Sequence, residues 1–358
     1  MNETMNNTQP LTSDQAAKLW QASRLSVAVS YEKAPEILKV GESVIGTLGN
    51  FSASIGKAKS KKTFNVTALV AATLTNGKVL NYTASLPEDR RRVLYVDTEQ
   101  SPYHCQKVMR RILRLCGMST DQDHPNLEFL ALRRYTPEER IAITREAIYT
   151  LPDIGLVVID GIRDFLYDIN SPSESTKIIT LLMQWTDERQ IHIHTILHQN
   201  KGDENARGHI GTELTNKAET VLSVEKSGED KDVSTVKTAH IRAMDFEPFA
   251  FRINADGLPE LVGGYKISEK GESKAKKAFD PHADISEQTH RIALESAYAE
   301  RKEYGYHELA NALREAYAMV SVNLGQNKVV KLISVLKCKR MLVQNASKKY
   351  VYNPDFTY

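Results

Sequence analysis

The 358-residue sequence predicts an α/β fold with a doubly wound, mostly parallel sheet, followed by a smaller domain of helices and a hairpin. Short apolar runs alternate with longer segments of helical periodicity, as expected of parallel strands that crossover helices bury on both faces. After a charged, polar stretch near residue 270 the strands give way to helical patterns. We expect four parts: an N-terminal tail and helix (1–34), an α/β domain (35–265), a linker (266–283) and a C-terminal domain (284–358).

Apolar runs bounded by turn residues are expected to form the strands. VLYVD and GLVVID have the continuous apolar character of strands buried on both faces. The expected strands are Val93–Asp97, Gly155–Asp160, Ile191–His198, Thr220–Glu225, Ser234–His240 and Phe249–Ile253. The last three follow one another without a helical pattern, so we expect a meander at one edge of the sheet.

Segments with apolar residues at helical spacing separate the strands and fill the C-terminal domain. In the first domain we expect helices at Leu11–Arg24, Thr63–Thr75, Pro102–Cys116, Thr136–Tyr149 and Ser173–Arg189. In the C-terminal domain we expect helices at Ile285–Lys302, Tyr306–Met319 and Gly325–Lys337, and strands at Met341–Val343 and Tyr350–Tyr352. Three helices followed by a hairpin is the plan of a winged helix.

Composition excludes some classes of protein and points to a polyanionic partner. Hydrophobic residues make up 41% of the chain and charged residues 26%, which excludes wholesale disorder. No apolar run approaches the roughly 18 residues that span a membrane, and three cysteines fit a reducing cytoplasm. The net charge of +2 is uneven, because the stretch from Ala316 to Pro354 holds seven basic residues and no acidic one.

The segment GKAKSKKT at positions 56–63 is typical of a phosphate-binding loop. Gly56, Lys62 and Thr63 match the P-loop pattern G-x-x-x-x-G-K-[ST], whereas Lys61 replaces its second glycine. In such a loop the lysine neutralises phosphate and the hydroxyl binds Mg²⁺. We expect ATP to contact Gly56, Lys57, Lys59, Ser60, Lys61, Lys62, Thr63 and Phe64. A lysine-rich surface loop is the alternative interpretation.

Polar residues at the ends of three expected strands would complete a site for ATP hydrolysis. Asp160 closes GLVVID and suits a carboxylate that holds Mg²⁺ together with Thr63. Asp97 and Glu99 follow the strand VLYVD, and either could orient the attacking water. His198 opens the stretch His-Gln-Asn-Lys that closes a later strand, where it could sense the γ-phosphate.

The order of these motifs resembles that of RecA-like P-loop ATPases, and within them the RepA-like branch of plasmid and mobile-element hexameric helicases related to DnaB. The resemblance covers about residues 35–255 and includes Arg207–Gly211, which matches weakly a loop where DNA contact is expected. It implies Glu99 as the catalytic carboxylate, His198 as the sensor and a basic residue supplied by a neighbouring subunit. Arg242 is the candidate for that residue and Lys237 the runner-up. A homo-oligomeric ring, such as a hexamer, is implied with it.

The basic C-terminal domain resembles winged-helix domains in its plan and is expected to bind DNA. Amide and lysine side chains on the expected helix Gly325–Lys337 and on the hairpin suit base edges and phosphates. The candidates are Gln326, Asn327, Lys328, Lys331, Lys348 and Lys349. A winged helix used for protein contact is the alternative.

The sequence therefore predicts an ATP- and Mg²⁺-dependent DNA-binding ATPase that acts in replication or mobilisation of a plasmid or integrated element. An ATP-switched DNA-binding or loader protein with little turnover is the first alternative, and Lys61 in the loop favours it. A small-molecule kinase is disfavoured, because it leaves the basic C-terminal domain unexplained. No membrane partner is expected.

Overall fold

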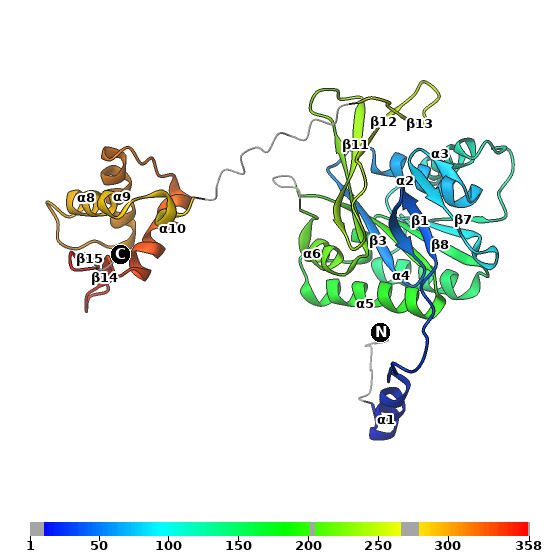
Figure 1. The fold of residues 1–358 in the computed structure, drawn as a ribbon, viewed down its shortest axis with the longest axis horizontal. Coiled ribbons are helices and arrows are strands. Elements are labelled where there is room, and N and C mark those ends of the chain that lie inside the picture. Colours follow the sequence, from blue (N-terminus) through cyan, green and yellow to red (C-terminus); the bar gives the residue numbers. More distant parts are fainter. Residues whose placement is uncertain (1–10, 201–204, 266–278, 357–358) are drawn as a thin grey trace. The chain divides into compact units, whose positions relative to one another are not determined.

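A computed structural model describes residues 11–200, 205–265 and 279–356 (Figure 1). The chain divides into two compact units, Met1–Ile267 and Ser268–Tyr358. The following parts of the sequence analysis lie outside the described residues: the tail 1–10, Lys201 and residues 266–278 of the expected linker. No helix within the described ranges is long and apolar enough to cross a membrane.

In the described residues, a nine-stranded sheet with the order β13-β12-β11-β10-β3-β9-β8-β6-β7 forms the centre of the first unit. The strands from β10 to β7 are all parallel to their neighbours, whereas β11, β12 and β13 continue the sheet antiparallel. Their bounds are β3 Phe51–Gly56, β6 Arg92–Asp97, β7 Leu127–Ala131, β8 Ile154–Asp160, β9 His192–His198, β10 Thr220–Lys226, β11 Val233–Ile241, β12 Phe249–Ile253 and β13 Pro259–Leu261. The predicted α/β class with a mostly parallel sheet is confirmed.

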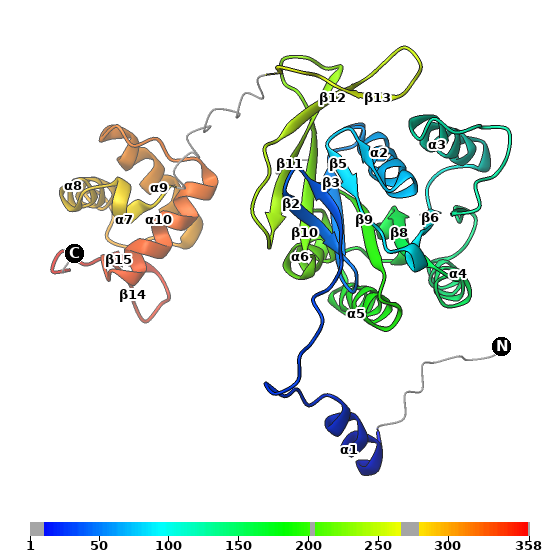
Figure 2. The same ribbon diagram turned by 45° about the vertical axis from the view of Figure 1, so that its right-hand side comes forward.

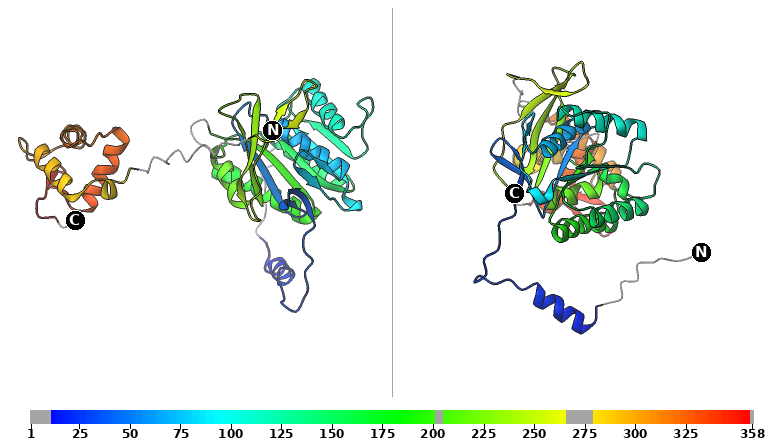
Figure 3. Two further views of the ribbon diagram at one scale, coloured as in Figure 1. Left: turned by 45° about the horizontal axis from the view of Figure 1, so that its top comes forward. Right: turned by 90° about the vertical axis from the view of Figure 1, so that its right-hand side faces the viewer.

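Helices cover both faces of this sheet (Figure 2). On one face lie α2 (Lys62–Thr75) and α3 (Pro102–Leu115), which share a hydrophobic core with a second sheet of order β2-β1-β5-β4. The strands of that sheet are β1 Glu36–Val40, β2 Ser43–Thr47, β4 Lys78–Val79 and β5 Tyr82–Ala84. The opposite face carries α4 (Pro137–Thr150), α5 (Pro172–Arg189) and α6 (Gly208–Lys217) over a separate core, and the right-hand view of Figure 3 shows the same layering.

Parallel pairing brings the ends of the motif-bearing strands to one edge of the sheet. In the strand register, Gly56 is paired with His198 and Asp97 is paired with Asp160. Since α2 follows β3 after the short phosphate loop, and α3 follows β6 after a short turn, the amino ends of both helices lie at this same edge. This edge is where a doubly wound sheet binds ligands.

Two buried histidines of β9 form a chain of hydrogen bonds with residues of β2 and β3. His192 Nδ1 is 2.8 Å from the Thr47 carbonyl, so this nitrogen carries the proton and Nε2 accepts from Ser52, 2.7 Å away. Ser52 Oγ then accepts from His194 Nδ1 at 2.8 Å, and Ser54 donates to His194 Nε2 at 2.9 Å. Both rings have satisfied partners and support the core, which argues against the zinc site that two histidines on one strand face could suggest.

Several elements differ from the sequence-based expectation. The segment after β9, expected to be a loop at Arg207–Gly211, begins helix α6 at Gly208, because Ile210 and Leu214 are buried in the core. Gly211 permits this packing, since a Cβ there would lie 2.5 Å from the carbonyl carbon of Ala206. The expected N-terminal helix is present as α1 (Ser13–Ala22), with no buried residue. The small sheet, β7 and β13 were not predicted, and neither were the short helices η1 (Glu88–Arg90) and η2 (Ile162–Phe165).

Within its described residues, 279–356, the second unit contains three longer helices, one short helix and a hairpin around its own core. The elements are α7 Pro281–Asp284, α8 Glu287–Ala297, α9 Tyr306–Met319, α10 Gln326–Cys338, β14 Leu342–Gln344 and β15 Tyr350–Tyr352. Helix α8 ends five residues before the expected Lys302, because Tyr304 leaves the helical path to pair with Tyr350 and its ring packs against Tyr298. The predicted core residues Leu309, Leu313, Val329, Leu332 and Leu336 are all buried.

Candidate nucleotide-binding cleft

A cleft of about 310 Å³ lies at the carboxyl ends of β9, β8 and β6, between the first turns of α2 and one face of α3. It brings together residues that are more than a hundred positions apart in the sequence. The predicted residues that line it are Lys59, Ser60, Lys61, Lys62, Thr63, Phe64, Asp97, Glu99, Asp160 and His198. Gly56 and Lys57 do not line the cleft, but their carbonyl groups hold Lys62.

The backbone of the phosphate loop has the shape that its glycine pattern normally supplies. Gly56 is required, because a Cβ there would lie 2.3 Å from the Val224 carbonyl oxygen of β10. Lys59 and Lys61 adopt left-handed backbone conformations, with φ of +63° and +67°. Such angles are unfavourable for residues with a side chain, so Lys61 takes the conformation of the missing glycine at a cost of roughly 1 kcal/mol. The loop is therefore formed despite the substitution.

Lys62 places a buried ammonium group at the centre of the cleft. Its Nζ donates to the carbonyls of Gly56 at 2.8 Å and Lys57 at 3.0 Å, and lies 3.2 Å from His198 Nδ1. Burial lowers the pKa of Lys62 to about 8, although Asp160 and Glu99 favour its charged form. Burial makes the charged form of Lys62 unfavourable, and the negative charge of a phosphate group bound here would stabilise it.

Asp160 and Thr63 form the candidate Mg²⁺ site. Oδ2 of Asp160 accepts hydrogen bonds from Thr63 Oγ1 at 3.0 Å and from the Tyr95 hydroxyl at 2.9 Å. Burial, together with the nearby Asp97 carboxylate, raises the pKa of Asp160 to about 7. A buried carboxylate beside a hydroxyl fits Mg²⁺, which prefers hard oxygen ligands and is commonly held by one or two protein groups and substrate phosphates. When bound, the ion would offset charge on the phosphates.

Asp97 and Glu99 have different surroundings, although the residue pattern alone did not separate them and only the family resemblance favoured Glu99. The Asp97 carboxylate accepts the backbone N–H groups of Glu99 and Gln100 and the Gln100 side chain, and therefore shapes the turn after β6. Glu99 lines the cleft with a half-exposed side chain, and its Oε1 lies 3.7 Å from His198 Nε2. This imidazole is the main cause that holds the pKa of Glu99 below its ordinary value, so the side chain is a carboxylate at neutral pH.

Neither candidate for the subunit-bridging cation approaches the cleft of its own chain. Arg242 is exposed and donates to the Lys217 carbonyl at 3.0 Å. Arg242 follows Ile241, the last residue of β11, which pairs with Thr220 at the start of β10. Thr220 also pairs with Ser52 near the start of β3, so Arg242 lies at the sheet edge opposite the phosphate loop, which follows the other end of β3. Lys237 lies further along β11 and forms an ion pair of 3.1 Å with Glu225.

Residues that the sequence analysis did not single out complete the cleft walls. On α3, the Arg111 guanidinium lies 3.6 Å from the centre of the Phe64 ring, and Lys107 lines the same wall. Gly161 follows Asp160 with φ of +104°, and a Cβ there would lie 2.4 Å from Thr98 Oγ1. The Asp-Gly pair at the end of GLVVID is the one sequence signal that could have predicted this close contact.

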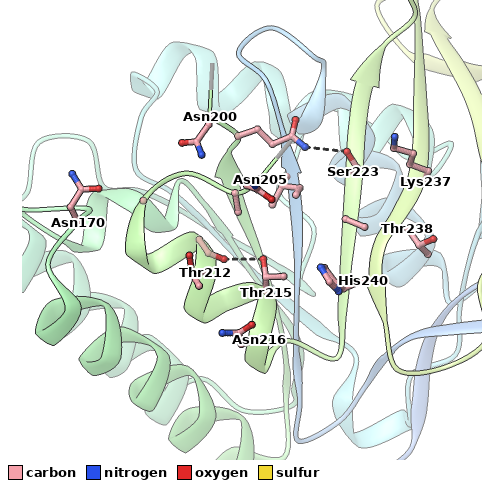
Figure 4. A pocket seen from close by; sticks show the side chains of 16 residues that line it. Asn170, Asn200, Asn205, Thr212, Thr215, Asn216, Ser223, Lys237, Thr238 and His240 are labelled. Carbon is pink, nitrogen blue, oxygen red and sulfur yellow. Dashed lines mark hydrogen bonds between the residues drawn. The ribbon is translucent and has the colours of Figure 1, made fainter. Parts of the chain in front are cut away.

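A larger cavity, of about 770 Å³, lies beside α6 and the strands β10 and β11 (Figure 4). Amide and hydroxyl side chains dominate its lining, which includes Asn170, Asn205, Thr212, Thr215 and Asn216. Lys237 and His240 of β11 lie on its other side. Its lining contains no carboxylate among the described residues, so the chemistry of phosphate transfer fits the smaller cleft better.

The candidate DNA-binding residues of the second unit are placed unequally. Gln326, Lys328, Lys331 and Lys348 are exposed, and the Lys328 ammonium lies 5.1 Å from the centre of the Phe279 ring. The side chain of Asn327 lies outside the described set. Lys349 is partly exposed, and its Nζ forms a 2.7 Å ion pair with Glu303, which compensates part of its charge.

Residues 33–204 match the family model of the AAA domain. The matched segment contains the phosphate loop and the strands β6, β8 and β9, and it supports a P-loop ATPase domain with nucleotide-dependent activity. No curated protein matches the sequence. The crystal structure of the RadB recombinase aligns with 60% of this chain and 91% of its own, at 16% identity and a TM-score of 0.42.

The pKa of Lys62 predicts how nucleotide affinity depends on pH. The pKa of Lys62, about 8, lies below that of a free lysine, so most of the protein loses this ammonium proton above pH 8. Above that pH, ATP binding requires Lys62 to take up a proton again. We expect the Kd for ATP to rise by roughly an order of magnitude between pH 7.5 and 9, as measured by calorimetry. Lys62→Arg is the control, because its guanidinium stays charged over this range, and its Kd should change less than about twofold. Equal pH dependence in both proteins would contradict the assignment.

Proposed function

We propose that this protein is an ATP- and Mg²⁺-dependent ATPase that binds DNA and belongs to the RepA-like branch of RecA-like ATPases. The observation that carries the proposal is the convergence of Lys62, Thr63, Asp160, Glu99 and His198 on one cleft. The order of the sequence motifs supports a role in replication or mobilisation of a plasmid or integrated element, as a helicase or translocase.

In the proposed reaction a water molecule held by Glu99 attacks the γ-phosphate in line with the leaving group. Lys62 neutralises charge on the β- and γ-phosphates, and Thr63 and Asp160 would hold Mg²⁺. His198 lies between Glu99 and Lys62, 3.7 Å from one and 3.2 Å from the other, where it can respond to the γ-phosphate. Asp97 positions Glu99 through the backbone of the turn between them.

Assembly into a ring, such as a hexamer, would place β11 of one subunit near the cleft of the next. Arg242 remains the candidate for the cation supplied in trans, with Lys237 as the runner-up. Their distance from the cleft of their own chain is compatible with this role, since a cation supplied in trans acts on a neighbouring subunit.

DNA binding is proposed for two surfaces. In the second unit, three helices and a hairpin support a winged-helix domain in which Gln326 and Asn327 contact bases and Lys328, Lys331 and Lys348 contact phosphates. In the first unit, the amide-lined cavity next to Arg207–Gly211 supports contact with a nucleic-acid strand, because amides pair with base edges.

An ATP-switched DNA-binding protein with little turnover is the second candidate. Lys61 favours this candidate, because it replaces the glycine of the usual loop pattern and adopts a strained left-handed conformation there. A steady-state ATPase assay with and without single-stranded DNA separates the two, because only the ATPase gives multiple turnovers that DNA stimulates.

Removing the carboxylate of Glu99 is expected to separate binding from hydrolysis. Glu99→Gln keeps the size of the side chain but cannot accept a proton, so turnover should fall at least about 100-fold while ATP still binds. The measurement is steady-state phosphate release together with calorimetric ATP binding. Glu42→Gln, a change at an exposed carboxylate outside the cleft, should retain full turnover. Unchanged turnover in Glu99→Gln would assign the water to another group.

Because Lys349 forms an ion pair, we expect two double lysine variants to change the salt dependence of duplex DNA binding by different amounts. Lys328→Ala with Lys331→Ala removes two exposed charges and should flatten the slope of log affinity against log salt by about 1.8, at about −0.9 per contact. Lys348→Ala with Lys349→Ala should flatten it by about half as much, because Glu303 compensates Lys349.

Fluorescence anisotropy with the full chain measures both slopes. Lys302→Ala, at an exposed lysine outside α10 and the hairpin, is the control and should leave the slope unchanged. If neither double variant alters the slope, the second unit contacts protein rather than DNA.

A further inference from the structure

Lys61 connects the phosphate loop to a distant turn. Its Nζ donates to the main-chain carbonyl of Asp232 at 2.6 Å. Asp232 ends the turn between β10 and β11, since β11 begins at the next residue. The side chain that replaces the usual glycine therefore makes a contact that a glycine could not make.

The contact compensates for an unfavourable backbone. A lysine in the left-handed region is less stable there than a glycine, so a side chain at this position needs a favourable interaction. Lys59 provides a comparison within the same loop, because its φ of +63° is nearly that of Lys61. Lys59 is exposed and makes no hydrogen bond to the turn among the described residues, so Lys59 has the backbone strain alone, whereas Lys61 has both the strain and the contact.

The turn that receives Lys61 is itself ordered. Ser227 Oγ accepts the backbone N–H groups of Glu229 and Asp230, and Asp230 Oδ1 accepts that of Asp232 at 2.8 Å. The N–H of Val233 donates to the Asp230 carbonyl at 3.1 Å. These bonds hold the Asp232 carbonyl, which Lys61 contacts, in a fixed position next to Val233, the first residue of β11.

The position of Lys61 gives this connection a direction, because Lys61 also lines the cleft. Phosphates held by the backbone of the loop would fix the residue from which this side chain extends. The hydrogen bond would pass that restraint to the Asp232 carbonyl. Nucleotide in the cleft should then order the turn as well as the loop.

We propose that Lys61 is a positioning residue that couples occupancy of the phosphate loop to β11 through the carbonyl of Asp232. The inference rests on the proposed nucleotide site and extends it to the strand that carries Lys237 and precedes Arg242. In a ring, the state of one cleft would thereby influence the cations that its own subunit presents to the next.

Hydrogen exchange with a non-hydrolysable ATP analogue and Mg²⁺ tests this coupling in the full chain. In the parent protein, exchange should slow about fivefold both in the phosphate loop and in residues 227–241. In Lys61→Gly, exchange in the phosphate loop should still slow about fivefold, whereas exchange in residues 227–241 should slow less than about twofold. Lys61→Arg keeps a cation and should restore the response.

Lys59→Gly is the matched comparison for backbone strain, because it relieves a similar left-handed angle without touching the turn. Since Lys59 lines the cleft, every variant is measured at saturating analogue, and the ratio of the turn response to the loop response in Lys59→Gly should equal that of the parent. A response of residues 227–241 that persists in Lys61→Gly would overturn the coupling, as would its loss in both glycine variants, which would point to loop strain instead. If the analogue slows exchange in the phosphate loop of no variant, including the parent, the proposed nucleotide site itself fails.

Discussion

The parallel packing of β3 between β9 and β10 is the constraint on which the site depends. Gly56 ends β3 with no room for a side chain against β10, and its register partner on β9 is His198. The next strands, β8 and β6, end at Asp160 and Asp97 on the same edge. Helix α2, which begins after the phosphate loop that follows β3, then places Lys62 and Thr63 at the same edge as both carboxylates.

This packing concentrates charges that burial makes unfavourable. The pKa of Lys62 is lowered to about 8 and that of Asp160 is raised to about 7, so each group is drawn toward its neutral form. Their hydrogen bonds to Gly56, Lys57, Thr63 and Tyr95 compensate only in part. Such groups persist where a ligand supplies the missing charge, and a nucleotide phosphate with a divalent cation supplies both signs.

The sequence predicted the parts of the fold that local pattern determines. Apolar runs ending in Asp97, Asp160 and His198 located three strands, and Gly56, Lys62 and Thr63 located the loop between β3 and α2. The residue pattern, without the family resemblance, could not rank Asp97 against Glu99, because their difference lies in backbone N–H groups that only the folded turn presents. Helix α6 was missed because its two glycines disfavour a helix that core packing stabilises. The partners of Lys61 and Lys349 are tertiary contacts, with Asp232 and Glu303, that no spacing in the sequence reveals.

Calorimetric titration of the full chain with ATP and Mg²⁺ tests the central claim most directly. Lys62→Ala removes the buried ammonium and should weaken binding more than tenfold, a change above about 1.4 kcal/mol. Lys57→Ala, at an exposed side chain of the same loop that contributes only its carbonyl, should bind within about twofold of the parent. Binding by Lys62→Ala with the affinity of the parent would contradict the account, because the cleft would then not be the nucleotide site.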